Sequence, residues 1–147
     1  MIPLTTAQNT AWRLFLKTYA VLLEQIERTL KQANLPDLSW YDVLWALEEA
    51  PDRRLRLHEL ADALVLQRSN LTRLVDRMEH AGVVQRETCA SDRRGAFATI
   101  TPAGLALRQK MWQVYAQSIH QHFAEPLSEE QVSGLAQAFS LLLKAQS

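Results

Sequence analysis

Apolar residues recur at steps of three and four through residues 6–33, which is the spacing of one face of an α-helix. This stripe comprises Trp12, Phe15, Tyr19, Leu22, Ile26 and Leu30. A helix of this length extends roughly 40 Å at about 1.5 Å per residue, which is farther than the core of one small domain reaches. We therefore expect this helix to pack against a second chain.

Residues 34–37 contain a proline and interrupt the helical pattern. Ser39 is expected to cap a second helix, which stops before Pro51 because the residue preceding a proline disfavours the helical region. Residues 55–57 alternate in the manner of a short strand. From His58 onward, the spacing of apolar residues predicts two short helices joined by a tight connection.

The second of these short helices is expected to begin near Ser69, with the serine hydroxyl as its N-cap. Its buried stripe is predicted at positions i, i+3, i+4 and i+7, which are Leu71, Leu74, Val75 and Met78. Gly82 is expected to end the helix, because glycine readily adopts the left-handed conformation. Strands at residues 83–88 and 97–100 then predict a hairpin with Asp92-Arg93-Arg94 at its tip.

Thr101 as a cap and Pro102 at the first helical position open another long helix, which is apolar on two sides. A last helix follows Ser128, which together with Glu130 and Gln131 resembles a capping box. A helix pair followed by a two-stranded hairpin is a winged helix-turn-helix arrangement. We predict a mainly α-helical fold with a small β-hairpin wing.

We expect one domain over residues 1–147. The winged helix-turn-helix is placed at about residues 38–101, and the flanking helices at about 6–33 and 102–147 are expected to mediate dimerisation.

The charged residues are biased toward arginine, but their total charge produces no strong electrostatic field. The formal net charge is zero, yet nine arginines lie between residues 52 and 94, and no lysine does. Arginine is favoured where a planar, forked donor contacts phosphate or a guanine edge. A GC-rich coding sequence would produce the same bias, so composition alone leaves both explanations open.

The polar face of the helix near Ser69 matches what reading of the DNA major groove requires, since the first turn of a recognition helix reaches base edges. One arginine of the hairpin tip is expected to enter the neighbouring minor groove, attracted by its negative potential. Asp92 is expected to hold an arginine through a charge-assisted hydrogen bond. The predicted DNA-contacting residues are Arg68, Ser69, Asn70, Thr72, Arg73, Arg77, Asp92, Arg93 and Arg94.

The run RSNLTRLVDRMEHAGVV at residues 68–84, with Arg86, SDRR at 91–94 and ITPAG at 100–104, resembles the MarR/SlyA family of bacterial transcriptional regulators. Ile100 and Met78 stand where leucine is commoner in the family, and both are apolar replacements. The resemblance implies a homodimer whose terminal helices interlock and whose two winged helices bind a pseudo-palindromic operator in double-stranded DNA. It also implies control of its own or a neighbouring operon, usually by repression.

Carried over to this sequence, the resemblance assigns groove reading to Ser69, Asn70, Thr72 and Arg73, and the wing contact to residues 92–94. It further implies relief of repression by a small phenolic or aromatic-acid effector. Packing in the core and at the dimer interface is the alternative role for each aromatic residue. The candidate effector-binding residues are Trp12, Phe15, Tyr19, Trp45, Met111, Trp112 and Tyr115.

Other classes of function find little support in the sequence. There is no glycine-rich phosphate loop, nucleophile elbow or HExxH motif, so we expect neither an enzyme nor a bound cofactor. The single cysteine, Cys89, excludes an internal disulfide, and a redox role at the base of the wing stays an alternative. His120 and His122 point apart on a helix, and no metal site is expected.

No apolar run is long enough for a membrane span and the N-terminus lacks the features of a secretory signal, which favours a cytoplasmic protein. A dimeric helical adaptor that binds protein through the winged domain remains the alternative function.

Overall fold

The computed structural model describes residues 1–66, 70–88 and 96–147. The chain divides into two compact units. The first, called here the terminal-helix unit, comprises Met1–Thr29 and Tyr115–Ser147, and the second, the winged-helix unit, comprises Leu30–Val114.

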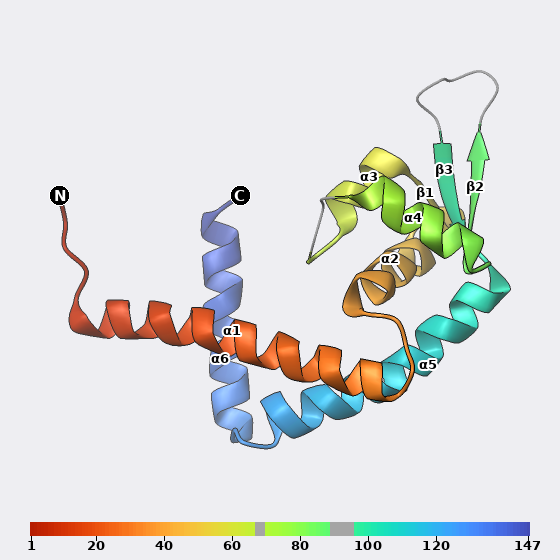
Figure 1. The fold of residues 1–147 in the computed structure, drawn as a ribbon. Helices are drawn as coiled ribbons and strands as arrows, with labels where there is room; N and C mark the ends of the chain where they lie inside the picture. The colour runs from red at the N-terminus through yellow and green to blue at the C-terminus, as the bar shows by residue number, and fades with distance from the viewer. Residues whose placement is uncertain (67–69, 89–95) are drawn as a thin grey trace. The chain divides into compact units, whose positions relative to one another are not determined.

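The elements follow the order expected from the apolar pattern, with a mainly helical chain and a small antiparallel sheet (Figure 1). The α-helices are α1 (Thr6–Gln32), α2 (Leu38–Glu49), α3 (Leu57–Ala63), α4 (Leu71–His80), α5 (Pro102–Ile119) and α6 (Glu129–Ala145). The strands are β1 (Arg54–Arg56), β2 (Val84–Thr88) and β3 (Ala96–Ile100). A 3-10 turn at Pro51–Arg53 precedes β1, and a π-helical turn at His120–Ala124 continues α5.

The core of the winged-helix unit forms where α2, α3 and α4 meet one face of the sheet. The predicted stripe of α4 is the buried one, since Leu71, Leu74, Val75 and Met78 all lie in this core. Val43, Leu44 and Leu47 of α2 are fully buried beside them. Because this stripe is buried, the opposite side of α4 faces solvent.

The sheet has three strands in the order β1-β3-β2, all antiparallel. The predicted hairpin is confirmed, with Val84 paired to Ile100 and Thr88 paired to Ala96. The short strand predicted at residues 55–57 is confirmed as β1 but lies one residue earlier, since Leu57 begins α3. It pairs with the edge of β3 opposite β2, with Arg54 opposite Thr99 and Arg56 opposite Phe97. This pairing connects the segment before α3 to the base of the hairpin.

Two helix starts differ from the sequence prediction. Ser39 is not the cap of α2; Asp37 is, because its carboxylate accepts a hydrogen bond from the Ser39 backbone N–H at 3.0 Å. The expected cap at Ser69 is also wrong: α4 starts at Leu71 and its N-cap is Asn70. Asn70 has a positive φ of 61°, and it makes no side-chain capping bond within the described part of the helix.

The junction between the hairpin and α5 depends on close backbone contacts. Gly82 ends the α4 segment with φ of 80°, as predicted. Thr101 caps α5 as predicted, since its Oγ1 accepts from the Gly104 N–H at 3.1 Å and donates to the Gly82 carbonyl at 2.7 Å. A Cβ at Gly104 would collide with the Val83 carbonyl oxygen and lie 2.8 Å from Ile100 Cγ1. The first turn of α5 therefore needs glycine at this position.

We expect Gly104→Ala to lower the free energy of unfolding by about 1–3 kcal/mol, the usual effect of forcing extra volume into a close contact. Urea or thermal unfolding measures the change. Gly134→Ala is the matched control, because nothing lies within 4 Å of a Cβ built at that position of α6. In the control, alanine replaces glycine inside a helix and stability should rise slightly. Equal stability of the two variants would contradict the proposed clash.

The terminal-helix unit leaves much of its apolar surface uncovered within one chain. Phe15 of α1 contacts Phe139 of α6 with ring centroids 6.1 Å apart. In the first half of the apolar stripe of α1, Trp12, Phe15 and Tyr19 are nevertheless exposed, and no residue of α6 is buried. The capping box predicted at Ser128 is confirmed through Gln131. Among the described residues, no helix is long and apolar enough to cross a membrane.

Candidate nucleic-acid interface

The outward face of α4 carries the predicted contact residues that the structure describes. Asn70, Thr72, Arg73 and Arg77 are all exposed, on the side opposite the buried stripe. Arg68 and Ser69 of the predicted set lie outside the described residues. The described four lie along the exposed side of the helix, from its N-cap Asn70 to Arg77 in its last turn.

Two arginines of this face are available for binding an anion. Among the residues that the structure describes, no acidic side chain forms an ion pair with Arg73 or Arg77. Exposed guanidinium groups can donate two parallel hydrogen bonds to phosphate oxygens or to a guanine edge. The surface of α4 therefore has the chemistry that a polyanion requires.

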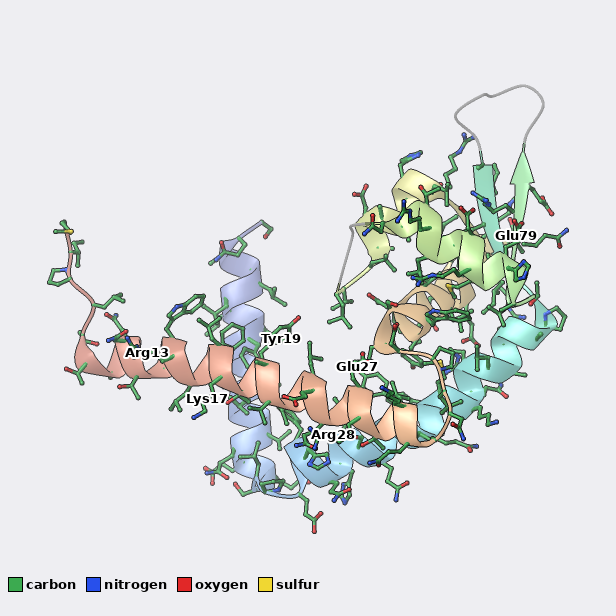
Figure 2. The ribbon with its side chains drawn as sticks, in the orientation of Figure 1. Arg13, Lys17, Tyr19, Glu27, Arg28 and Glu79 are labelled. Atoms are coloured by element: carbon green, nitrogen blue, oxygen red, sulfur yellow. The ribbon has the colours of Figure 1, made fainter. Side chains whose placement is uncertain are left out.

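A third arginine, Arg86 of β2, has a structural role that the sequence did not reveal. Its guanidinium pairs with Asp76 and lies 3.6 Å from Glu79 Oε1, and its backbone N–H donates to Glu79 Oε2 at 2.7 Å. Asp76 and Glu79 both belong to α4, and Glu79 lies on its strand side (Figure 2). This cluster fixes α4 against β2, and it neutralises the Asp76 carboxylate, which would otherwise repel phosphate.

Asn70 has a backbone role in addition to its predicted contact role. Its left-handed conformation is unfavourable for most residues with a Cβ, and asparagine and glycine tolerate it best. Asn70→Ala would therefore strain the helix start as well as remove the amide. Asn70→Gly relieves the backbone and isolates the loss of the side chain, so it is the cleaner substitution for a test of base reading.

The strands position the wing, although its predicted contacts at Asp92, Arg93 and Arg94 lie outside the described residues, as does Cys89. Where β1 pairs with β3, the guanidinium carbons of Arg54 and Arg56 lie 4.5 Å and 4.8 Å from the centroid of the Phe97 ring. Arg54 also lies 3.9 Å from Glu87. Cation–π contacts of this kind stabilise β1 against β3, and they were not predictable from the sequence pattern.

The seven candidate effector residues fall in both units. Trp12, Phe15, Tyr19 and Tyr115 belong to the terminal-helix unit, where the Trp12 and Phe15 ring centroids are 5.8 Å apart. In that unit, a cavity of about 200 Å³ opens between α1 and the end of α5. Of the seven, Tyr19 alone lines this cavity; the lining residues are Tyr19, Leu22, Leu23, Ile26, Ser118, Ile119, His122 and Phe123.

Trp45, Met111 and Trp112 belong to the winged-helix unit. Trp112 stacks on Tyr41 of α2 with ring centroids 6.0 Å apart, and it and Trp45 remain about half exposed. Met111 is fully buried, so it cannot contact a ligand without rearrangement of the core.

Beside the stacked rings, the partly buried Arg108 of α5 pairs with Glu48 of α2. Burial raises the pKa of the Tyr41 phenol above its ordinary value, against the opposing effect of Arg108. The stacked rings and the ion pair together hold α2 against the first part of α5. Within the described part of the chain, no group of three or more histidine, cysteine or acidic residues is placed to hold a metal ion.

Comparison with known proteins gives a consistent result over nearly the whole chain. The model of the MarR family matches residues 33–95. AbsC, a MarR family transcriptional regulator from Streptomyces coelicolor, is 33% identical, with 99% of this chain and 98% of that chain covered and a TM-score of 0.84. Sco3205, a MarR family transcriptional regulator from the same organism solved in complex with DNA, is 30% identical over 99% of this chain and 91% of that chain, with a TM-score of 0.86.

A more distant structure shares the fold. MarR from E. coli in its apo form is 24% identical, with 97% of this chain and 98% of that chain covered and a TM-score of 0.73.

Proposed function

Since the chain belongs to the MarR family of transcriptional regulators, we propose that it binds a specific operator in double-stranded DNA as a homodimer and represses the adjacent operon. The observation that carries the proposal is the outward face of α4. It presents Arg73 and Arg77 without an acidic partner in the described chain, whereas the acidic residues nearby are neutralised by Arg86. The DNA complex of Sco3205 supports the same use of the fold.

In this proposal the contacts divide into two kinds. The first turn of α4, together with Arg68 and Ser69, reads base edges in the major groove, and one of the two wing arginines, Arg93 or Arg94, enters the minor groove. Contacts between arginine and phosphate provide affinity without sequence preference. Repression follows where an operator overlaps the site that RNA polymerase must occupy.

The homodimer is proposed from the uncovered apolar surface of the terminal-helix unit. A soluble monomer rarely exposes so many large apolar side chains on neighbouring helices. Association of two chains would cover them and would place two winged helices to bind the two halves of a pseudo-palindrome.

We further propose that a small phenolic or aromatic acid relieves repression. The cavity lined by Tyr19 has about 200 Å³, and an apolar cavity of roughly 150 Å³ already accommodates a benzene ring. The half-exposed Trp45 and Trp112 offer a second aromatic surface. A panel of phenolic acids tests both places by tryptophan fluorescence and by release of DNA; no response in either measurement would eliminate this class of effector.

The DNA-binding proposal is tested by selecting bound sequences from a random pool of duplexes and measuring the enriched sequence by fluorescence anisotropy. We expect a pseudo-palindromic site bound with Kd of about 10 nM or tighter near physiological salt, resistant to excess unrelated duplex and steeply weakened by added salt. A pool without an enriched sequence, combined with weak binding that ignores salt, would reject the proposal and favour a protein-binding adaptor.

A further inference from the structure

The two residues that follow the end of α3 are held by one side chain of α2. The backbone N–H groups of Val65 and Leu66 donate to the same carboxylate oxygen, Oδ2 of Asp42, at 3.0 Å and 2.9 Å. Asp42 is about nine-tenths buried, and the two donors follow directly after Leu64, where α3 ends. The carboxylate therefore fixes the backbone of Val65 and Leu66, the residues that leave α3 in the direction of α4.

These two hydrogen bonds explain why a charged group occurs among core residues. A buried carboxylate is costly unless hydrogen bonds replace its water shell, and bonds to an ionised acceptor are stronger than bonds between neutral groups. At the same time, Val65 and Leu66 follow the end of α3, and backbone N–H groups that are removed from water need an acceptor. The carboxylate and the two amides therefore satisfy each other's need for hydrogen bonds.

The helix that carries Asp42 is firmly placed. Val43 and Leu44, which follow Asp42 directly, have no exposed surface. Tyr41 stacks on Trp112, and Glu48 pairs with Arg108, so α2 is also fixed to α5. A hydrogen bond from a side chain of such a firmly packed helix fixes the position of the group that it binds.

The location of the bonds gives them a consequence for DNA reading. Leu66 precedes the start of α4 at Leu71 by five residues, and the residues between them include Arg68, Ser69 and Asn70. Farther along the helix, Asp76 and Glu79 connect α4 to β2 through Arg86. Asp42 thus anchors the chain ahead of the reading turn, whereas Arg86 anchors the helix beyond it.

We propose that Asp42 is a positioning residue for sequence-specific DNA binding, which sets the placement of the first turn of α4 through Val65 and Leu66. This inference rests on the proposed function. Asp42 itself need not touch DNA. Asp42 contributes to the difference in affinity between operator and unrelated DNA. Base contacts depend on accurate placement of the reading turn, whereas phosphate contacts tolerate small displacements.

The test compares Asp42→Ala, Asp42→Asn and the wild-type protein on the selected operator and on an unrelated duplex. We expect Asp42→Ala to reduce the ratio of the two affinities by about tenfold or more, which is what loss of hydrogen bonds to a charged group represents. Binding of the unrelated duplex should change less than about threefold, since Arg73 and Arg77 are untouched. Asp42→Asn keeps an acceptor oxygen and should restore most of the ratio.

Amide hydrogen exchange provides a readout that does not involve DNA. The Val65 and Leu66 amides should exchange faster in Asp42→Ala and close to the wild-type rate in Asp42→Asn. Asp62→Ala is the matched control, because Asp62 is an exposed aspartate on neighbouring α3 and its removal changes the net charge equally. The control should leave both the affinity ratio and the exchange unchanged.

A second variant keeps the inference testable should Asp42→Ala fail to fold. Val65→Pro removes one of the two donors and leaves Asp42 in place. Leu64 has φ of −70° and ψ of 138°, which is the conformation that a residue before proline adopts, and the Val65 side chain is exposed. We expect Val65→Pro to reduce the ratio of operator affinity to unrelated-duplex affinity, by less than Asp42→Ala does.

The outcomes separate the two proposals. A wild-type protein without preference for any duplex would reject the proposed function. A wild-type protein with such a preference, together with an Asp42→Ala variant whose two amides exchange faster but whose affinity ratio is unchanged, would overturn the positioning role alone.

Discussion

The Arg73→Ala variant is expected to bind the operator roughly a hundredfold more weakly, a loss of about 2.7 kcal/mol. Arg73 is exposed on α4 and forms no ion pair with an acidic residue in the described chain. A groove or phosphate contact of arginine contributes about 1–3 kcal/mol, and in a homodimer on two half-sites each substitution removes two such contacts. The expected loss is therefore about twice that of a single contact.

Anisotropy titrations at several salt concentrations measure both the affinity and its salt dependence. If Arg73 contacts phosphate, the slope of log K against log salt should decrease by about two, one for each half-site. If Arg73 reads a base edge instead, the slope should change little and the preferred base at one position of each half-site should be relaxed. The two results distinguish a phosphate contact of Arg73, which positions the helix, from a contact of Arg73 with a base edge.

Arg28→Ala is the control for the change in net charge. Arg28 is exposed on α1, pairs with Glu24 at 3.1 Å, and lies in the terminal-helix unit (Figure 2). Its removal should alter operator affinity by less than about threefold, because a charge outside the interface acts only through the screened field. Equal losses in the two variants would show that Arg73 acts through net charge and makes no contact of its own.

Those parts of the fold that depend on local sequence were predictable. The stripe of α4 repeats at the helical period and buries the residues expected from it, because one face must pack on the core. Gly82 and Thr101 mark the ends of their helices through chemistry that involves only near neighbours. Such signals act within a few residues, so they can be recognised without knowledge of the tertiary structure.

Helix caps illustrate where local signals become ambiguous. Asp37 and Ser39 can both accept a backbone hydrogen bond, and the carboxylate forms the cap in the structure. At α4, the chain enters through a left-handed Asn70, which the expectation of a conventional serine cap did not anticipate. Where two nearby residues can both cap a helix, the sequence leaves the first residue of that helix uncertain by one or two positions.

The remaining features of the site depend on contacts between residues distant in sequence. Asp42 and Leu66 are 24 residues apart, and Arg86 reaches Asp76 across 10 residues of helix and turn. No periodicity encodes such a pair, since it forms only once the helices and strands have packed. The sequence therefore predicted which face of α4 is exposed, and it did not predict which groups hold that face in place.

The candidate effector residues show the same limit for aromatic side chains. Large aromatic residues occur in cores, at interfaces and around ligands, and the apolar pattern does not separate these environments. In the structure, Met111 is core, Tyr19 lines a cavity and Trp112 stacks on Tyr41. Burial removes only Met111 from the seven candidates, whereas Trp12, Phe15, Tyr19, Trp45 and Trp112 are all exposed.

Leu143→Glu is expected to convert the proposed homodimer to monomers and to reduce operator affinity at least a hundredfold. Leu142 and Leu143 of α6 are 60% and 74% exposed in the single chain, although a helix stripe of leucine is normally covered. Burying a carboxylate in an apolar interface costs several kcal/mol, which favours dissociation. Monomers lose the high effective concentration of the second winged helix, an advantage of about 10²–10⁴ for linked sites.

Sedimentation velocity over a range of protein concentrations measures the assembly, and anisotropy on the same samples measures operator binding. Gln137→Glu is the matched control, because it adds the same charge to an exposed position of α6 roughly 120° around the helix from Leu143. It should leave dimer and affinity unchanged. A Leu143→Glu dimer with full affinity would exclude this face of α6 from the interface, whereas a monomer with full affinity would show that one winged helix suffices for binding. Loss of both properties together would link the uncovered apolar surface of the terminal helices directly to the avidity on which operator recognition depends.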